Sequence, residues 1–196
     1  MALVLARVGG REQELRRPEV ANDAVALYDT AAADLRHAAA LWEDGQRKDW
    51  LAVVMGRLGT VARQLGDYDR ALDYYTWTEA LFDALGNDAG RASALGRRGY
   101  TLSRRYQARG EGDPQEIERL LLEALRLSEQ IGNRWGVAAN SLRYAEYLES
   151  RNEPARALTY AEHARALFAL IPDPSRAQQA IVLIARLQAQ ARQLEA

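Results

Sequence analysis

The eleven residues from Leu65 to Tyr75, LGDYDRALDYY, constrain the fold more than any other stretch of the chain. Gly66 can adopt the left-handed backbone that ends a helix. Asp67 can cap the helix that follows by accepting a hydrogen bond from its first turn. Ala71 is small enough for a second helix to pack closely beside it. The stretch therefore predicts a tight turn between two closely packed helices.

This pattern recurs downstream at a regular spacing. Residues 153–158, EPARAL, align with residues 67–72, DYDRAL. Three tripeptides also align as the ends of successive units: Leu85-Gly86-Asn87, Ile131-Gly132-Asn133 and Ile171-Pro172-Asp173. Gly86 and Gly132 are 46 residues apart, and Gly132 and Pro172 are 40 apart. A period in this range predicts stacked helical pairs, each of which needs its neighbours to bury its apolar face.

Apolar residues at steps of three and four predict amphipathic helices through residues 21–196. In the first full repeat, Trp50, Leu58 and Leu65 mark one apolar face. We expect a partial repeat at 21–48, full repeats at 49–87, 88–133 and 134–173, and a C-terminal capping helix at 174–196. Residues 1–20 are expected to form an N-terminal arm or the remnant of a preceding helix.

The second repeat carries an insertion. Gly99 and Ile117 are 18 residues apart, whereas Gly59–Ala71 and Ala145–Ala157, the equivalent intervals, are 12 residues each. The extra residues fall at 107–114 and include two glycines and a proline. We expect a longer turn there, either as a tolerated surface insertion or as a functional loop.

Composition narrows the classes of partner. The 196 residues carry a net charge of −1, which gives no overall attraction to nucleic acid or to anionic membranes. No stretch approaches the roughly 20 apolar residues of a membrane span. The chain has no cysteine, so it lacks disulfides and thiolate metal sites, as expected in a reducing cytoplasm. We expect a cytoplasmic protein without nucleic-acid or membrane partners.

The units resemble the long type of tetratricopeptide repeat, of about 40 residues. The resemblance covers about residues 21–196 and rests on small residues where the two helices of a pair cross: Leu58-Gly59, Ala71, Thr78, Gly99, Ala124, Ala145, Ala157 and Ala164. Ile117 departs from it, because the family places alanine there, and Thr78 and Pro172 are also atypical of the family. Kinesin light chains and many bacterial regulators and scaffold proteins contain similar units. The resemblance implies an all-α solenoid, a right-handed superhelix of antiparallel helix pairs, and a binding mode rather than a chemistry.

No pattern in the sequence indicates catalysis. His37 and His163 are the two histidines, and neither has a second histidine at metal-ligand spacing. Glu146 and Glu149 share a helical face with Arg143, an arrangement that forms a solvated charge cluster more often than an acid–base pair. We expect no enzymatic reaction, no metal and no cofactor.

Arginines recur at one position of the predicted repeats. Arg57, Arg97 and Arg143 each lie two residues before the small residue of the first helix. The resemblance implies that these first helices line a concave groove, so we expect a ladder of three guanidiniums facing an open channel. Fixed guanidiniums suit carboxylate recognition, but the same arginines can also form plain ion pairs with Glu146, Glu149 or other carboxylates.

Three more residues complete the candidate peptide-binding site. Arg63 and Arg104 lie further along the same helices, and Tyr100 is a candidate aromatic anchor. The function expected is a non-catalytic scaffold that binds a protein or peptide segment, acidic segments being favoured. The alternative is a ligand- or peptide-sensing regulatory domain of a bacterial transcription or signalling regulator.

The last predicted helix has a clear apolar face. Its members follow one another at spacings of 3, 4, 3, 4 and 3 residues: Ala177, Ala180, Ile184, Leu187, Ala191 and Leu194. We expect this helix to cap the last repeat with its polar side outward. Val182 and Leu183 are left over from this face, and the alternative is that they pair with a second chain in a homodimer.

Overall fold

The computed structural model describes residues 45–171 and 173–194, with side chains for 48–171 and 173–193. Within these ranges the chain is α-helical and contains no strand, which confirms the all-α class. The expected arm at 1–20, and the expected partial repeat as far as residue 44, lie outside the described residues.

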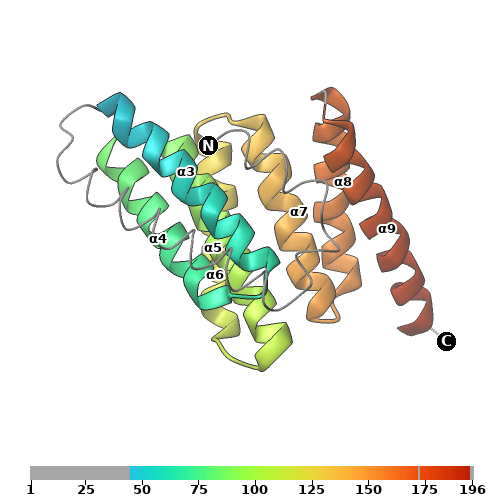
Figure 1. Cartoon of the computed structure of the whole chain (residues 1–196). Coiled ribbons are helices and arrows are strands. Elements are labelled where there is room, and N and C mark those ends of the chain that lie inside the picture. Colours follow the sequence, from blue (N-terminus) through green and yellow to red (C-terminus); the bar gives the residue numbers. More distant parts are fainter. Residues whose placement is uncertain (1–44, 172, 195–196) are drawn as a thin grey trace.

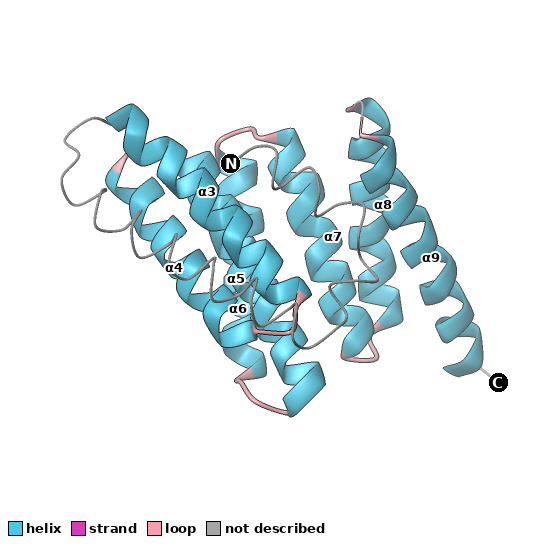
Figure 2. Cartoon of the chain, in the orientation of Figure 1, coloured by secondary structure: helices cyan, strands magenta, loops and turns pink. Residues whose placement is uncertain are grey.

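Seven helices follow one another in the described part of the chain, joined by short turns (Figures 1 and 2). They are α3 (Gly45–Gln64), α4 (Tyr68–Ala84), α5 (Asp88–Arg109), α6 (Pro114–Gln130), α7 (Arg134–Ser150), α8 (Pro154–Leu170) and α9 (Pro174–Leu194). The intervals 88–133 and 134–173 each contain two helices, whereas α3 begins at Gly45, four residues before the boundary expected at residue 49.

The turn at Gly66 forms as its sequence predicts. Gly66 has a φ of +81°, and the Asp67 carboxylate accepts a hydrogen bond of 3.2 Å from the backbone N–H of Arg70. The same pairing of a left-handed glycine with a capping side chain occurs at Gly86-Asn87 and Gly132-Asn133. Short turns of this kind reverse the chain, so each helix runs antiparallel to the one before it.

The helices are arranged side by side in sequence order, from α3 and α4 at one end to α9 at the other (Figure 1). Each helix packs on the next, and α7 also contacts both α5 and α9. The odd-numbered helices α5, α7 and α9 are therefore neighbours in space. A surface that runs across them can be built from equivalent positions of successive pairs.

Small residues let these helices approach one another. A Cβ atom at Gly59 would lie 2.8 Å from the Tyr75 ring of α4, and one at Gly99 would lie 3.0 Å from Cγ of Leu121 in α6. Ala145, at the equivalent position of α7, is completely buried. The sequence therefore predicted these close crossings correctly. Trp50, by contrast, was expected in the core and is 51% exposed.

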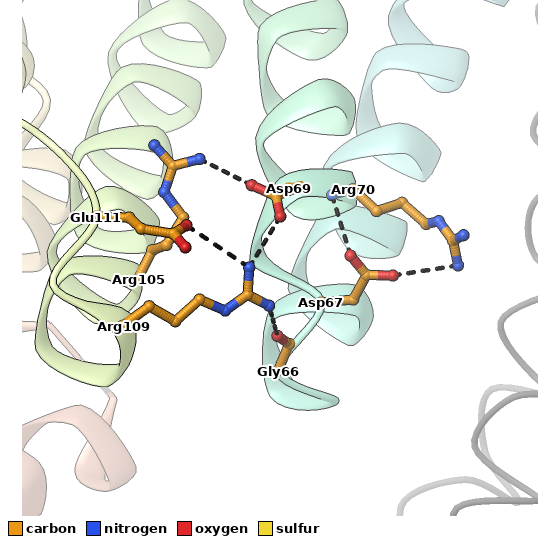
Figure 3. A network of polar contacts seen from close by, with 7 residues as sticks. All are labelled: Gly66, Asp67, Asp69, Arg70, Arg105, Arg109 and Glu111. Atoms are coloured by element: carbon orange, nitrogen blue, oxygen red, sulfur yellow. Dashed lines mark hydrogen bonds and ion pairs between the residues drawn. The ribbon is translucent and has the colours of Figure 1, made fainter.

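The insertion lengthens mainly a helix, and the turn that was expected to be longer gains only one residue. α5 has 22 residues where α7 has 17, and the turn after it, at 110–113, has four residues where the turn at 151–153 has three. The added helical turn lies against the start of α4 (Figure 3). Arg105 and Arg109 donate hydrogen bonds of 2.8 and 2.9 Å to the two carboxylate oxygens of Asp69.

The last helix packs on α8 through the predicted face, with one difference. Ala180, Leu183 and Leu187 are buried, so Leu183 belongs to the core and is not left over. Ile181 and Val182 are each 46% exposed on the outer side. In the described part of the chain, no helix is both long and apolar enough to cross a membrane.

Candidate functional site

A cleft runs across the odd-numbered helices, and five of the six predicted site residues line it. We call it the odd-helix cleft. It consists of two adjoining pockets that share Arg63, Tyr100 and Glu146. The first, of about 280 Å³, is named the Arg143 pocket and includes Thr60, Arg63, Arg97, Tyr100, Arg143, Glu146, Arg176 and Gln179. The second, of about 470 Å³, is named the Arg104 pocket and includes Arg63, Tyr100, Arg104, Gln107, Glu146, Glu149 and Arg186.

Arg143 is the most enclosed charge in the cleft, being only 7% exposed. Its Nη1 donates a hydrogen bond of 2.6 Å to Oδ1 of Asn140, one turn earlier on α7. Asn140 is fully buried and is fixed in turn, because its Nδ2 donates to the Ala124 carbonyl and to Oγ of Ser128 on α6. The expectation that this arginine faces an open channel is therefore wrong, since α6 and α7 hold it at the base of the pocket.

The surroundings of Arg143 disfavour its positive charge. Burial lowers the pKa of Arg143 to about 9, and the charges of Arg97 and Arg176 contribute to the shift. Glu146 acts in the opposite direction, but it makes no ion pair with Arg143. A buried cation without a paired carboxylate is costly, so the pocket favours an added negative charge.

Arg97 is half-buried and links α5 to α3. Its Nη1 donates hydrogen bonds to the Gly56 carbonyl at 3.2 Å and to Oγ1 of Thr60 at 2.9 Å. Thr60 also shares a hydrogen bond of 3.0 Å with the hydroxyl of Tyr75. These contacts are to neutral groups, so they orient the Arg97 guanidinium without neutralising it.

Tyr100 lies where the two pockets meet. The guanidinium of Arg63 lies 5.1 Å from the centre of its ring, within the range of a cation–π contact. Burial raises the pKa of Tyr100 to about 12, and the nearby Glu146 carboxylate adds to the shift. The phenol is therefore neutral at physiological pH and presents both an aromatic face and a hydroxyl to the cleft.

Arg57 is the one predicted site residue that does not line the odd-helix cleft. Arg57 is exposed and lines a third, more apolar pocket of about 250 Å³ between α3, α4 and α5. Arg97 lines that pocket too, so it borders both spaces. Arg104 is exposed in the Arg104 pocket, where its Nη1 donates to Oε1 of Gln107 at 3.0 Å. The expected ladder of three equivalent guanidiniums is therefore wrong.

Sequence reasoning missed Arg176 as a site residue. It lies in the first turn of α9, on the helix whose polar side was expected to face outward, and it lines the Arg143 pocket. The order of the helices is the signal that could have identified Arg176. α9 follows α8 as the first helix of another pair would, so its polar face borders the same surface as α5 and α7.

The arginines of the Arg143 pocket are unpaired although they are buried or half-buried, whereas unpaired arginines elsewhere in the described chain, such as Arg126 and Arg165, are exposed. Arg98 pairs with Glu79, Arg186 pairs with Glu149, and Arg105 and Arg109 pair with Asp69. The four arginines of the pocket, Arg63, Arg97, Arg143 and Arg176, make no ion pair with any described carboxylate. The alternative that Arg143 simply pairs with Glu146 or Glu149 is thus wrong for the described part of the chain.

Comparison with known proteins gives a fold and no family. No family model matches the chain, and no curated protein matches it. In fold, the chain is similar to BtubC. The crystal structure of BtubC (BKLC) from P. vanneervenii has a TM-score of 0.64 and 18% sequence identity, and the match covers 96% of this chain and 70% of BtubC. At this identity the likeness concerns the fold alone.

Proposed function

We propose that the chain is a tetratricopeptide-like α-solenoid that binds a protein or peptide segment in the odd-helix cleft and catalyses no reaction. The observation that carries this proposal is the composition of the cleft. Arg63, Arg97, Tyr100, Arg104 and Arg143 line one surface across successive helices. A cleft of this kind suits a segment that crosses several helices.

The charges favour an acidic segment. The four arginines of the Arg143 pocket face one carboxylate, that of Glu146, and none of them is paired with it. Charge-assisted hydrogen bonds to a carboxylate are stronger than those between neutral groups. Because the outer part of the cleft is open to water, the affinity should fall as salt concentration rises. The net charge of −1 and the lack of cysteine support a cytoplasmic protein whose partner is not a nucleic acid.

The partner can be found by site-specific crosslinking. A photoreactive phenylalanine analogue in place of Tyr100 should capture the partner in cells of the native host, for identification by mass spectrometry. The same analogue at Tyr68, on the first turn of α4 and outside the cleft, serves as the control. Equal capture from both positions would contradict binding in the cleft.

Calorimetry with the captured segment then tests the arginines. Replacing Arg63, Arg104 and Arg176 by glutamine should weaken binding at least tenfold, since all three border the cleft. Arg126 and Arg165 are exposed on α6 and α8, so a control variant with both replaced by glutamine should bind as the parent does. Equal affinity of the cleft variant and the parent would make these arginines ordinary surface charge.

A second candidate function is supported by the depth of the Arg143 pocket. A space of about 280 Å³ with a buried cation at its base suits a small acid as well as a side chain. The chain would then be the ligand-sensing domain of a regulator. Native mass spectrometry of protein purified from its host would reveal a retained small acid, and the absence of one would favour the segment-binding function.

A further inference from the structure

The starting point is a buried charge that no described carboxylate is paired with. Arg143 is more than nine-tenths buried, and its single hydrogen bond, from Nη1, goes to the neutral Asn140. A guanidinium has five N–H donors, so most of its capacity is unused within the described structure. A purely structural arginine at this depth would normally be paired with a carboxylate.

Two further guanidiniums converge on the same space. Arg97 from α5 and Arg176 from α9 both line the pocket, and both act on Arg143 as like charges. Like charges repel one another, so bringing three cations together at a pocket costs free energy unless an anion lies between them. The three come from three different helices, which means that the fold, and not one helix, brings them together.

The donors are also held in place before any ligand arrives. Arg97 is oriented by Gly56 and Thr60, and Arg143 by Asn140. Asn140 can do this because the facing residue of α5 is Gly96, where a Cβ atom would lie 2.1 Å from Oδ1. Preorganised donors lose little conformational freedom on binding, which favours a specific ligand.

We propose that Arg97, Arg143 and Arg176 bind an oxyanion, a carboxylate or phosphate group, in the Arg143 pocket. The inference rests on the proposed function, because the pocket is part of the odd-helix cleft, and it names the chemical group that the cleft recognises. The group is either carried by the bound segment, on a side chain or a C-terminus, or belongs to a free small acid. The volume of about 280 Å³ suits one such group and its immediate neighbours.

The first experiment uses inorganic phosphate, with chloride at equal ionic strength as the reference. At ten times its dissociation constant a ligand raises the ratio of folded to unfolded protein about 11-fold, which corresponds to a rise in Tm of about 3 to 6 °C for a chain of this size. The parent should show this rise and should bind phosphate in calorimetry. No rise and no heat of binding would overturn the inference.

Variants localise the effect. Arg143→Met should abolish the phosphate-dependent rise in Tm. Arg176→Gln, at a half-buried position, should lower the affinity for phosphate at least tenfold. Arg176→Gln keeps the test decisive if the buried substitution fails to fold. The controls Arg126→Gln and Arg165→Gln remove the same charge on the outer helices and should leave the response intact. Equal loss in the controls would mean a general salt effect and would overturn the inference.

Competition identifies the source of the oxyanion. N-acetylaspartate amide presents a side-chain carboxylate, N-acetylalanine presents a C-terminal one, and succinate represents a free small acid. Displacement of phosphate by either of the first two would support a group carried by a segment, and displacement by succinate alone would support a free acid.

If the captured segment binds while phosphate does not, the inference fails and the proposed function stands. If phosphate binds and no segment is ever captured, the oxyanion site stands and the segment-binding function fails.

Discussion

A Cβ atom at Gly96 would lie 2.1 Å from Oδ1 of Asn140, so α5 and α7 meet at a distance that only glycine permits. The same Oδ1 accepts the hydrogen bond of the buried Arg143 guanidinium. The crossing of two helices is therefore linked to the position of the central cation of the cleft. A change at Gly96 must move either the helices or Asn140.

The first prediction is that Gly96→Ala destabilises the protein. The added methyl group cannot be accommodated without displacing Asn140, and overpacking of this kind costs about 1–3 kcal/mol. Thermal and urea unfolding measure the loss. The variant should also lose its phosphate response, because Asn140 would no longer orient Arg143.

Gly56→Ala is the matched control for that prediction. Gly56 is also a buried glycine within a helix, but a Cβ there would make only an ordinary contact of 3.5 Å with Thr78. Alanine is favoured over glycine in a helix by about 0.5–1 kcal/mol, so this variant should be as stable as the parent or more stable. Equal destabilisation by both substitutions would show that the Gly96–Asn140 contact has no special role.

The second prediction concerns the added turn of α5 and its dependence on pH. Hydrogen bonds from Arg105, and to a smaller extent from Arg109, lower the pKa of the Asp69 carboxyl below its ordinary value. A carboxyl whose pKa is lowered by folding stabilises the protein above its unfolded-state pKa, and this contribution is lost as pH falls through the folded-state pKa. The parent should therefore melt at a higher temperature than Asp69→Asn at neutral pH, and the difference should vanish below that lowered pKa.

The effect should be small, because the side chain of Asp69 is 60% exposed and salt screens exposed ion pairs. Melting curves at pH 7, with and without added salt, and at acidic pH would measure it. Asp73→Asn serves as the control, since Asp73 is exposed on the same helix and makes no ion pair with a described residue. A difference that persists unchanged at acidic pH would rule out the ionised Asp69 carboxylate as its cause.

The third prediction concerns the two sides of α9. Leu183 is 1% exposed against the core, so Leu183→Ala should cost about 2–5 kcal/mol of unfolding free energy. Ile181→Ala, two residues earlier and on the exposed side, should change stability by less than about 0.5 kcal/mol. Urea unfolding of the two variants distinguishes a packed face from a free one.

The exposed side of α9 also tests the homodimer that the sequence left open. If α9 only caps the last repeat, Ile181→Glu and Val182→Glu should leave the molar mass in solution unchanged. Size-exclusion chromatography with light scattering measures this mass. A parent dimer that becomes a monomer in these variants would show that α9 is a contact between chains.

Features encoded within a few residues could be predicted from the sequence. The turn at Gly66 needs only a residue that tolerates positive φ and a capping side chain, and both are adjacent in the chain. The structure of the insertion was predicted wrongly, although its signal is local too. Residues 107–109, QAR, are good helix formers, so α5 continues until Gly110 adopts a left-handed conformation and ends it.

The candidate site depended on contacts that no local pattern encodes. The recurrence of Arg97 and Arg143 predicted that they share a surface, and both line the Arg143 pocket. The burial of Arg143 results from Asn140 and the Gly96 crossing, which are set by the packing of α5 on α7. Arg176 joins the pocket only because α9 continues the order of the helices.

The fourth prediction concerns Tyr100 as the anchor of a bound segment. Its ring faces the Arg63 guanidinium at 5.1 Å and lies where the two pockets of the cleft meet. Aromatic residues at the centre of an interface often contribute 2 kcal/mol or more, so Tyr100→Ala should weaken binding of the captured segment about 30-fold. Tyr100→Phe keeps the ring and should weaken binding much less, unless the segment forms a hydrogen bond with the hydroxyl.

Tyr68→Ala is the control. It removes a ring that lies 5.5 Å from Arg109 outside the cleft, and this variant should bind the segment as the parent does. Circular dichroism first shows that each of the three variants is folded, and calorimetry then measures their affinity for the segment. If Tyr68→Ala loses as much affinity as Tyr100→Ala, the segment binds elsewhere on the surface.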